Sequence, residues 1–395
     1  MDAHDVDWLR SDEGARALAR AAEALAGGST ELAVLERLRR DLDPARARAV
    51  LALIEGRRSA AGKFADAERL FFDRESAEQA TAEAVARHTA ARFAGVRRIA
   101  DLGCGAGGDA LALAAHAPVL AVDRDPARLA LVVANAAVRG LPIEVAEAGV
   151  EAFALPDDID AAWLDPARRD EGGRVRDPEQ WSPPLSVALR IASTVPRAGI
   201  KVAPGIDLAA IPAACEVEFI SHAGTLVEAV LWSGAAVTAR RRATVVEADR
   251  AATVSGDADT GATPLAEPGT YLYDLDPAVG RAGLVDAVAP SLHAWRLDER
   301  TAYVSGDEAV DSPFARRFRI DAWLPFSERA LRQALADLGV TRVEVMRRAS
   351  PVDTNALEVR LNRALSSADR AARVRTVALT RVREAHVAIV CERER

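Results

Sequence analysis

A glycine-rich turn between an apolar strand and a helix constrains this chain more than any other feature. The apolar strand Arg98–Leu102 runs into Gly103, Gly105 and Gly107, and a second apolar strand then ends at Asp123. Three glycines allow the backbone to turn sharply and to approach a ligand where a Cβ would collide. The pattern therefore predicts an α/β fold that holds a nucleotide-like cofactor.

An acid, Asp101, precedes the first of these glycines and separates the possible cofactors. A dinucleotide fingerprint seats a pyrophosphate on a helix N-terminus, and an acid at this point repels phosphate. The acid suits a cationic ligand, and S-adenosylmethionine offers both a sulfonium and an ammonium. Asp123, at the tip of the second strand, is the candidate acceptor for the two ribose hydroxyls.

In these residues the chain resembles the class I S-adenosylmethionine-dependent methyltransferases, whose first motif reads acid-x-glycine-x-glycine. Val119–Asp123 matches their second-strand acid motif, Asn135 with Gly140 matches the helix end that follows, and Ala161–Arg169 stands at their fourth motif. Glycines after a strand occur in any α/β protein, but three motifs in the family's order are hard to reach by chance. The resemblance implies S-adenosyl-L-methionine as cofactor, bound by Asp101, Gly103, Gly105, Gly107, Asp123 and Asp165.

The fourth motif supplies the candidate catalytic residues Asp165, Pro166 and Arg168. Asp165 follows the fourth strand, in the crevice where ligands bind in such sheets, and Pro166 fixes the backbone as it leaves. Related enzymes that methylate base amines use acid-or-amide, Pro, Pro, aromatic; here Ala167 replaces the second proline and Arg168 the aromatic residue. Arg168 and Arg169 are candidates to stack on a base or to hold a phosphate. An ordinary turn aspartate is the alternative for Asp165.

Five further residues are weaker candidates. Glu147 stands where the family places a polar group beside the adenine, and an exposed strand-end glutamate is the equal alternative. Arg74, Gln79 and Thr81 fall where the lead-in helix of trimethylguanosine-synthase-like enzymes approaches the cofactor, although Gln79 is equally readable as a helix-surface residue. Lys201, one of only two lysines in the chain, faces either the pocket or a helix.

The alternation of strands and helices after Val96 predicts a Rossmann-like, doubly wound α/β sheet. Strands are expected at 98–102, 119–122, 143–146, 161–164, 199–203, 216–221 and 226–232. The turn His222–Thr225 between the last two is too short for a crossover, so these two strands should pair antiparallel. A seven-stranded sheet that ends in this way is the methyltransferase arrangement. Ahead of it, leucines at helical spacing predict an α-helical N-terminal subdomain.

The last segment carries its own pattern of strand, helix, strand, helix and a final hairpin. This order looks like an α+β ferredoxin-like module, and with the preceding core it resembles bacterial methyltransferases that carry a C-terminal THUMP-like domain. The expected domains are 1–90 (helical), 91–238 (methyltransferase), 239–310 (linker and connecting region) and 311–395 (THUMP-like). THUMP domains bind RNA in the enzymes that carry them, so the resemblance implies tRNA or rRNA as a partner; a dimerisation or packing module is the alternative.

Charge supports a separate basic segment at the end of the chain. Residues 311–395 contain 17 arginines and 11 acids, a net charge of +6, whereas the whole chain of 395 residues has a formal net charge of -8. That balance argues against indiscriminate coating of nucleic acid. The three cysteines lie far apart without ligand spacing, so neither a disulfide framework nor a metal site is expected.

No leader and no long apolar run is present, so a cytoplasmic location without membrane contact is expected. Three functions stay open: an RNA methyltransferase acting on a base nitrogen, a methyltransferase for a small molecule or protein side chain, and a non-catalytic RNA-binding protein with a vestigial cofactor site.

Overall fold

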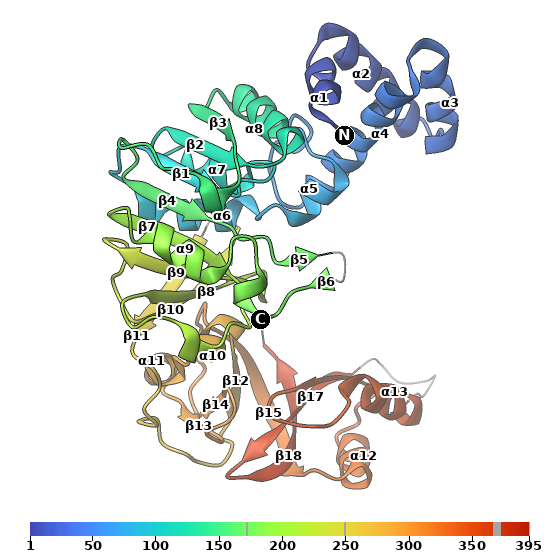
Figure 1. The fold of residues 1–395 in the computed structure, drawn as a ribbon. Coiled ribbons are helices and arrows are strands. Elements are labelled where there is room, and N and C mark those ends of the chain that lie inside the picture. Colours follow the sequence, from blue (N-terminus) through green and yellow to red (C-terminus); the bar gives the residue numbers. More distant parts are fainter. Residues whose placement is uncertain (171–172, 249, 366–372, 395) are drawn as a thin grey trace. The chain divides into compact units, whose positions relative to one another are not determined.

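A computed structural model describes residues 1–170, 173–248, 250–365 and 373–394 (Figure 1). The chain divides into two compact units: residues 1–216 with 228–238, and residues 217–227 with 239–395. The domain boundaries expected from the sequence stay predictions.

The first unit begins with helices that start at residues able to cap them. The helices are α1 (Ala3–Leu9), α2 (Asp12–Ala26), α3 (Glu31–Asp41), α4 (Pro44–Ala60), α5 (Arg74–Gln79) and α6 (Glu83–Ala90), followed by the 3-10 turn η1 (Ala91–Phe93). The Asp43 side chain accepts the backbone N–H groups of Ala45 and Arg46 at 2.9 and 3.1 Å, with Pro44 in the first turn. Such caps satisfy amides that have no partner within the helix. The helical N-terminal subdomain is confirmed.

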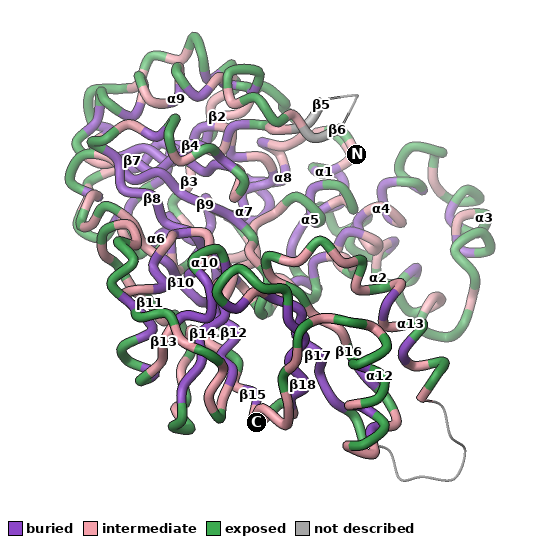
Figure 2. Tube along the Cα trace, turned by 90° about the horizontal axis from the view of Figure 1, so that it is seen from below, coloured by how far each residue is buried: buried purple, intermediate pink, exposed green. Residues whose placement is uncertain are grey.

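A sheet with the expected methyltransferase order follows. Its strands in this unit are β1 (Ile99–Leu102), β2 (Val119–Asp123), β3 (Ile143–Glu147), β4 (Ala161–Leu164), β7 (Arg197–Val202) and β9 (Thr225–Gly234). They lie in the order β9-β7-β4-β1-β2-β3, and all neighbours are parallel except β7 and β9. The helices are α7 (Gly108–Leu113), α8 (Pro126–Arg139) and α9 (Leu185–Ala192), with 3-10 turns η2 (Val150–Ala152), η3 (Pro178–Gln180) and η4 (Leu208–Ala210). The central strands are buried (Figure 2), as expected of a parallel sheet covered on both faces.

Two side chains fix the lead-in segment. Buried Asn135 of α8 accepts the amide of Phe71 at 2.7 Å and donates to the carbonyls of Phe71 and Ala106. Lys63 donates to three carbonyls at the end of α5, those of Ala77, Glu78 and Ala80, at 2.7–2.9 Å. The lead-in segment and the glycine turn are therefore held by the same helix, α8.

The second unit starts with β8 (Glu216–His222), one of the expected strands. Ala223 and Gly224, which follow it, both have positive φ, as in a tight turn. β10 (Arg241–Glu247) is parallel to β8, and β11 (Arg250–Gly256) is antiparallel to β10. Arg241 and Arg242 thus open a strand.

The THUMP-like region is part of a larger sheet than the sequence predicts. Its expected elements are all present: β15 (Ala315–Pro325), α12 (Glu328–Asp337), β16 (Arg342–Arg347), α13 (Thr354–Leu365), β17 (Val374–Val382) and β18 (Ala385–Arg393). β12 (Tyr271–Leu275), β13 (Trp295–Arg296) and β14 (Tyr303–Gly306) extend it to the order β13-β14-β12-β15-β18-β17-β16. Between them lie α10 (Pro277–Ala282), α11 (Val285–Val288) and η5 (Ala289–Leu292). Most of 271–306 is therefore sheet and helix that share the core of this region, including Leu272, Leu297 and Tyr303.

Candidate active site

Four charged residues form a row on one face of the first unit's sheet. Asp101 pairs in register with Trp163, two residues before Asp165; Leu164 pairs with Ile200, the residue before Lys201. Lys201 pairs with Val230, two residues after Glu228. Because side chains alternate between faces along a strand, Asp101, Asp165, Lys201 and Glu228 share a face. We call them the charged row.

Lys201 contacts two of the other residues of this row through its ammonium group. Its ammonium lies 2.5 Å from Thr81 Oγ1, 2.9 Å from Asp165 Oδ2 and 3.1 Å from Asp109 Oδ2, and 3.9 Å from Glu228 Oε2. Thr81 also donates to Asp109 at 3.2 Å. Lys201 is only 6% exposed, so these interactions are poorly screened by solvent. The sequence left open whether Lys201 faces the pocket, and the structure places it against Asp165.

An aromatic layer lies beside the charged row, formed by residues of β4, β9 and η1. Trp163, Trp232 and Phe93 pack against one another, with ring centroids 5.8–6.2 Å apart. Gly199 lies between the two indoles, and a Cβ there would stand 2.7 Å from Trp232 and 2.8 Å from Trp163. The charged row therefore rests on an apolar layer that excludes water.

The glycine turn has the backbone that its residues predict. Gly103, Gly105 and Gly107 have φ of 84°, 52° and 88°, in the region that favours glycine. A Cβ on Gly103 would stand 2.9 Å from the carbonyl oxygen of Asp165, and one on Gly105 would meet no atom within 4 Å. The Asp123 carboxylate accepts the amides of Gly105 and Asp125, each at 3.0 Å. Each of its oxygens keeps a second lone pair for a ligand hydroxyl.

Asp101 is the residue whose surroundings most clearly indicate a bound ligand. It is 1% exposed, and neither carboxylate oxygen has a hydrogen-bond partner among the described residues. Burial, with the neighbouring carboxylates of Asp109 and Asp165, raises its pKa well above the usual range. A cation beside it would satisfy the carboxylate and oppose that rise. A buried unpartnered acid beside a turn open at Gly105 fits S-adenosylmethionine.

The fourth motif is folded as a turn at the end of β4. Pro166 is buried, and Ala167 pairs with Ser182 through two backbone hydrogen bonds of 2.8 and 3.1 Å. The carbonyl of Arg168 accepts the amide of Val175, and its buried Nη1 has no partner among the described residues. The side chain of Arg169, at the start of the β5 (Arg169–Asp170) and β6 (Gly173–Arg174) ribbon, lies outside the described residues.

The weaker candidates divide into two groups. Glu147 is exposed at the end of β3, in register with Asp123. This position is compatible both with a polar group beside the adenine and with an ordinary exposed glutamate at a strand end. Gln79 is exposed on α5 and donates to Glu75 at 3.0 Å, and Arg74 pairs with Glu55 and Glu78. Those two lie on the surface, whereas Thr81 reaches the charged row. The binding roles of Glu147 and Gln79 stay predictions.

Comparisons with known proteins agree with this geometry. A profile described as "Methyltransferase domain" matches residues 99–166, and one described as "THUMP domain-like" matches residues 315–393. A domain of unknown function matches residues 2–61. Two proteins of Mycobacterium tuberculosis, strains CDC 1551 and H37Rv, are named as uncharacterized S-adenosylmethionine-dependent methyltransferases. Each is 36% identical over 322 residues, which cover 77% of this chain and 86% of the relative.

The chain belongs to the S-adenosylmethionine-dependent methyltransferases. S-adenosylmethionine is accordingly its cofactor, and the class I fold with a THUMP-like domain is confirmed. A crystal structure of a protein assigned as a methyltransferase, from Porphyromonas gingivalis W83, superposes with a TM-score of 0.75 at 18% identity. The match covers 96% of this chain and 98% of that one, which extends the likeness of fold over nearly the whole methyltransferase.

Sequence reasoning about this methyltransferase missed Asp109 and Glu228. Asp109 follows the glycine turn and was assigned no role, and Glu228 is an acid inside the apolar strand 226–232. An acid in an otherwise apolar strand was the available signal, because a buried charge needs a partner.

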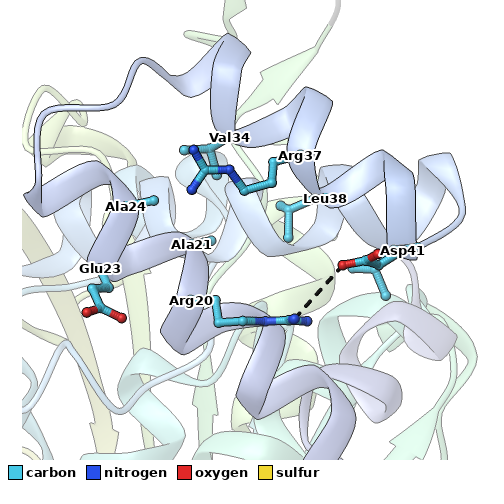
Figure 3. Close-up of a pocket in the computed structure, with 9 residues that line it drawn as sticks. Arg20, Ala21, Glu23, Ala24, Val34, Arg37, Leu38 and Asp41 are labelled. Carbon is cyan, nitrogen blue, oxygen red and sulfur yellow. Dashed lines mark ion pairs between the residues drawn. The ribbon is translucent and has the colours of Figure 1, made fainter.

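A pocket of about 330 Å³ also opens among the N-terminal helices (Figure 3). Arg20 and Asp41, 3.9 Å apart, lie at its edge over Ala21, Val34 and Leu38. None of the predicted site residues of the methyltransferase lines it. No described helix is long and apolar enough to cross a membrane.

Proposed function

We propose that this methyltransferase acts on RNA and transfers its methyl group to a nucleobase nitrogen held beside Asp165. The observation that carries the proposal is the THUMP-like match at 315–393 on the same chain as the methyltransferase domain. THUMP domains bind RNA in the enzymes that carry them, which favours an RNA over a free metabolite.

The arginines of the THUMP-like region support this partner. Many of them pair with acids, as Arg375 does with Asp321 and Arg360 with Glu328. Several others are exposed and have no acidic partner among the described residues: Arg329, Arg342, Arg363, Arg373, Arg383 and Arg393. Exposed, uncompensated arginines are the side chains that contact phosphates.

Three of these arginines lie on or beside β16, α13 and β17, which contact one another. Arg342 opens β16 in register with the start of β17, and the amide of Arg373 donates to Thr341 at 2.8 Å. Arg363 follows Asn362, whose side chain bonds both backbone groups of Val343. Arg342, Arg363 and Arg373 are the residues we propose for backbone contacts to RNA, and we call them the arginine set.

The charges at the charged row favour an amine as the methyl acceptor. Four acids, Asp101, Asp109, Asp165 and Glu228, lie around Lys201, and the ammonium holds one oxygen each of Asp109 and Asp165. An amine nitrogen gains positive charge as it is methylated, which acidic surroundings stabilise; a carboxylate acceptor would be disfavoured there.

Asp165 has the placement of a hydrogen-bond acceptor for that amine. One oxygen is held by Lys201, the side chain is 29% exposed, and the other oxygen has no partner among the described residues. Accepting an N–H from the amine would orient the nitrogen and raise its electron density. Alignment of this kind is the main demand of an in-line displacement.

The cofactor would be held by residues already described. Asp101 would face its positive charge, the glycine turn would pass beneath it, and Asp123 would accept its ribose hydroxyls. When bound, the cofactor supplies a methyl group on a positively charged sulfur, which leaves as a neutral thioether.

The test is transfer of radiolabelled methyl from S-adenosylmethionine to total RNA, small-molecule extract and protein from a host lacking this gene. Label in RNA, abolished in Asp165→Ala while cofactor binding by calorimetry stays within about threefold, is expected. Label only in another fraction would overturn the RNA substrate, and full activity of Asp165→Ala would overturn the role of that residue.

A further inference from the structure

We propose that Lys201 is a positioning residue for methyl transfer, because its ammonium fixes one oxygen of Asp165 and leaves the other for the acceptor amine. The inference rests on the proposed function of Asp165 and adds a residue that the methyltransferase motifs do not contain.

The three donors of Lys201 are all used. An ammonium has three N–H groups, and Thr81, Asp165 and Asp109 provide three acceptors at 2.5, 2.9 and 3.1 Å. These acceptors come from the α5–α6 connection, the end of β4 and the start of α7. A lysine bonded from three directions has one position, so it holds Asp165 Oδ2 in one position as well.

The alternative role, a proton acceptor, does not suit this lysine. Burial disfavours its charge, but the carboxylates of Asp109, Asp165 and Glu228 outweigh burial and raise its pKa above the usual range. A permanently charged ammonium cannot take a proton from the acceptor amine. Its contribution is a fixed charge and fixed geometry.

The surroundings explain why a cation is needed at this point. Asp109 Oδ1 and Glu228 Oε1 are buried without hydrogen-bond partners among the described residues, and the aromatic layer closes the space behind them. Without Lys201, the remaining carboxylates would repel Asp165 and displace its side chain. That displacement removes the ordered acceptor oxygen from the position that the amine needs.

The experiment compares wild type with Lys201→Met, a neutral residue of similar length, using total RNA as acceptor. We expect the rate at saturating RNA to fall on the order of 10- to 100-fold, as for other small misplacements of reacting groups. Affinity for S-adenosylmethionine, measured by calorimetry, should stay within about threefold. The KM for RNA should also stay within about threefold, so that the loss lies in the rate of methyl transfer and not in binding.

Lys63→Met is the matched control, since it removes the other lysine, which bonds only backbone carbonyls. It should leave the rate at saturating RNA within about threefold of wild type even if it lowers thermal stability. If Lys201→Met does not fold, Lys201→Arg keeps the cation, but a guanidinium cannot place one nitrogen between the same three oxygens. We expect its rate to fall several-fold.

A folded Lys201→Met variant with the wild-type rate at saturating RNA would overturn the inference. Full activity of Asp165→Asn and Asp165→Ala would instead overturn the proposed function, so the two failures are distinguishable.

Discussion

Glu228 is the residue whose ionisation should be visible in the stability of the protein. Burial, together with the carboxylates of Asp109 and Asp165, raises its pKa to about 8 against the opposing effect of Lys201. Between about pH 4.5, its ordinary value, and pH 8, the folded chain keeps a proton that the unfolded chain has lost. Glu228 therefore makes the protein less stable as pH rises through that window, and its effect is constant above it.

Glu228→Gln removes this dependence. The free energy of unfolding of the variant should gain on wild type between pH 5 and 8 and show a constant difference above about pH 8.5, measured by urea denaturation. The exposed Glu36→Gln is the control and should show no such change. A difference between wild type and Glu228→Gln that is flat across pH 5 to 8 would contradict the prediction.

The residues that could be predicted are those that a local motif fixes. Gly103, Gly105 and Gly107 were expected because a sharp turn needs such residues, and Asp101 because an acid before that turn suits a cationic ligand. Asp165 was expected because ligands bind in the crevice at the strand ends. Asp109 and Glu228 could not be predicted in this way. Their contacts with Lys201 depend on the register of distant strands and on the position of α7, which no short segment determines.

At the scale of elements, Gly199 of β7 is needed for the aromatic layer to close. Gly199→Ala would place a methyl group 2.7 Å from Trp232 and 2.8 Å from Trp163, both at most 1% exposed. Overpacking of this kind costs about 1–3 kcal/mol. We expect the free energy of unfolding to fall by that amount, measured by chemical denaturation.

Gly205→Ala is the control for that substitution, because a Cβ there meets no atom within 4 Å and φ is not positive. It should leave stability unchanged or raise it slightly, since alanine restricts the unfolded chain. Equal destabilisation by the two substitutions would show that contact with the indoles does not set the requirement for glycine at position 199.

Most elements were predictable, and the exceptions have a physical cause. The strands of the first unit and the elements of residues 315–393 follow from apolar runs bounded by turn residues. The strands in 239–310 were less apparent, because β10 opens with arginines and β13 has only two residues. Short, charged strands are stabilised by their neighbours in the sheet and leave little local pattern.

At the scale of the whole molecule, the proposed RNA contact should depend on salt. Replacing the arginine set by glutamine removes three cations that have no acidic partner among the described residues. The slope of log affinity against log salt for single-stranded RNA should fall by about 2, measured by fluorescence anisotropy with total RNA fragments.

The matched control changes the net charge equally. Arg319, Arg332 and Arg360 pair with Glu392 and Glu328, so their replacement by glutamine removes three compensated cations. This triple variant should lose less of the salt dependence. Equal losses in the two triple variants would mean that net charge, and not the arginine set, governs binding.

The aromatic layer beside the charged row also makes the fluorescence of its tryptophans sensitive to the charges of the site. The emission of an indole depends on the electric field across its ring. Trp163 lies on β4, two residues before Asp165, and Trp232 lies on β9, four residues after Glu228. Any event that alters charge in the row changes the field at these two of the six tryptophans, even where no atom moves. The change in intrinsic fluorescence that Trp163→Phe and Trp232→Phe abolish therefore reports the electrostatics of the site without an added label.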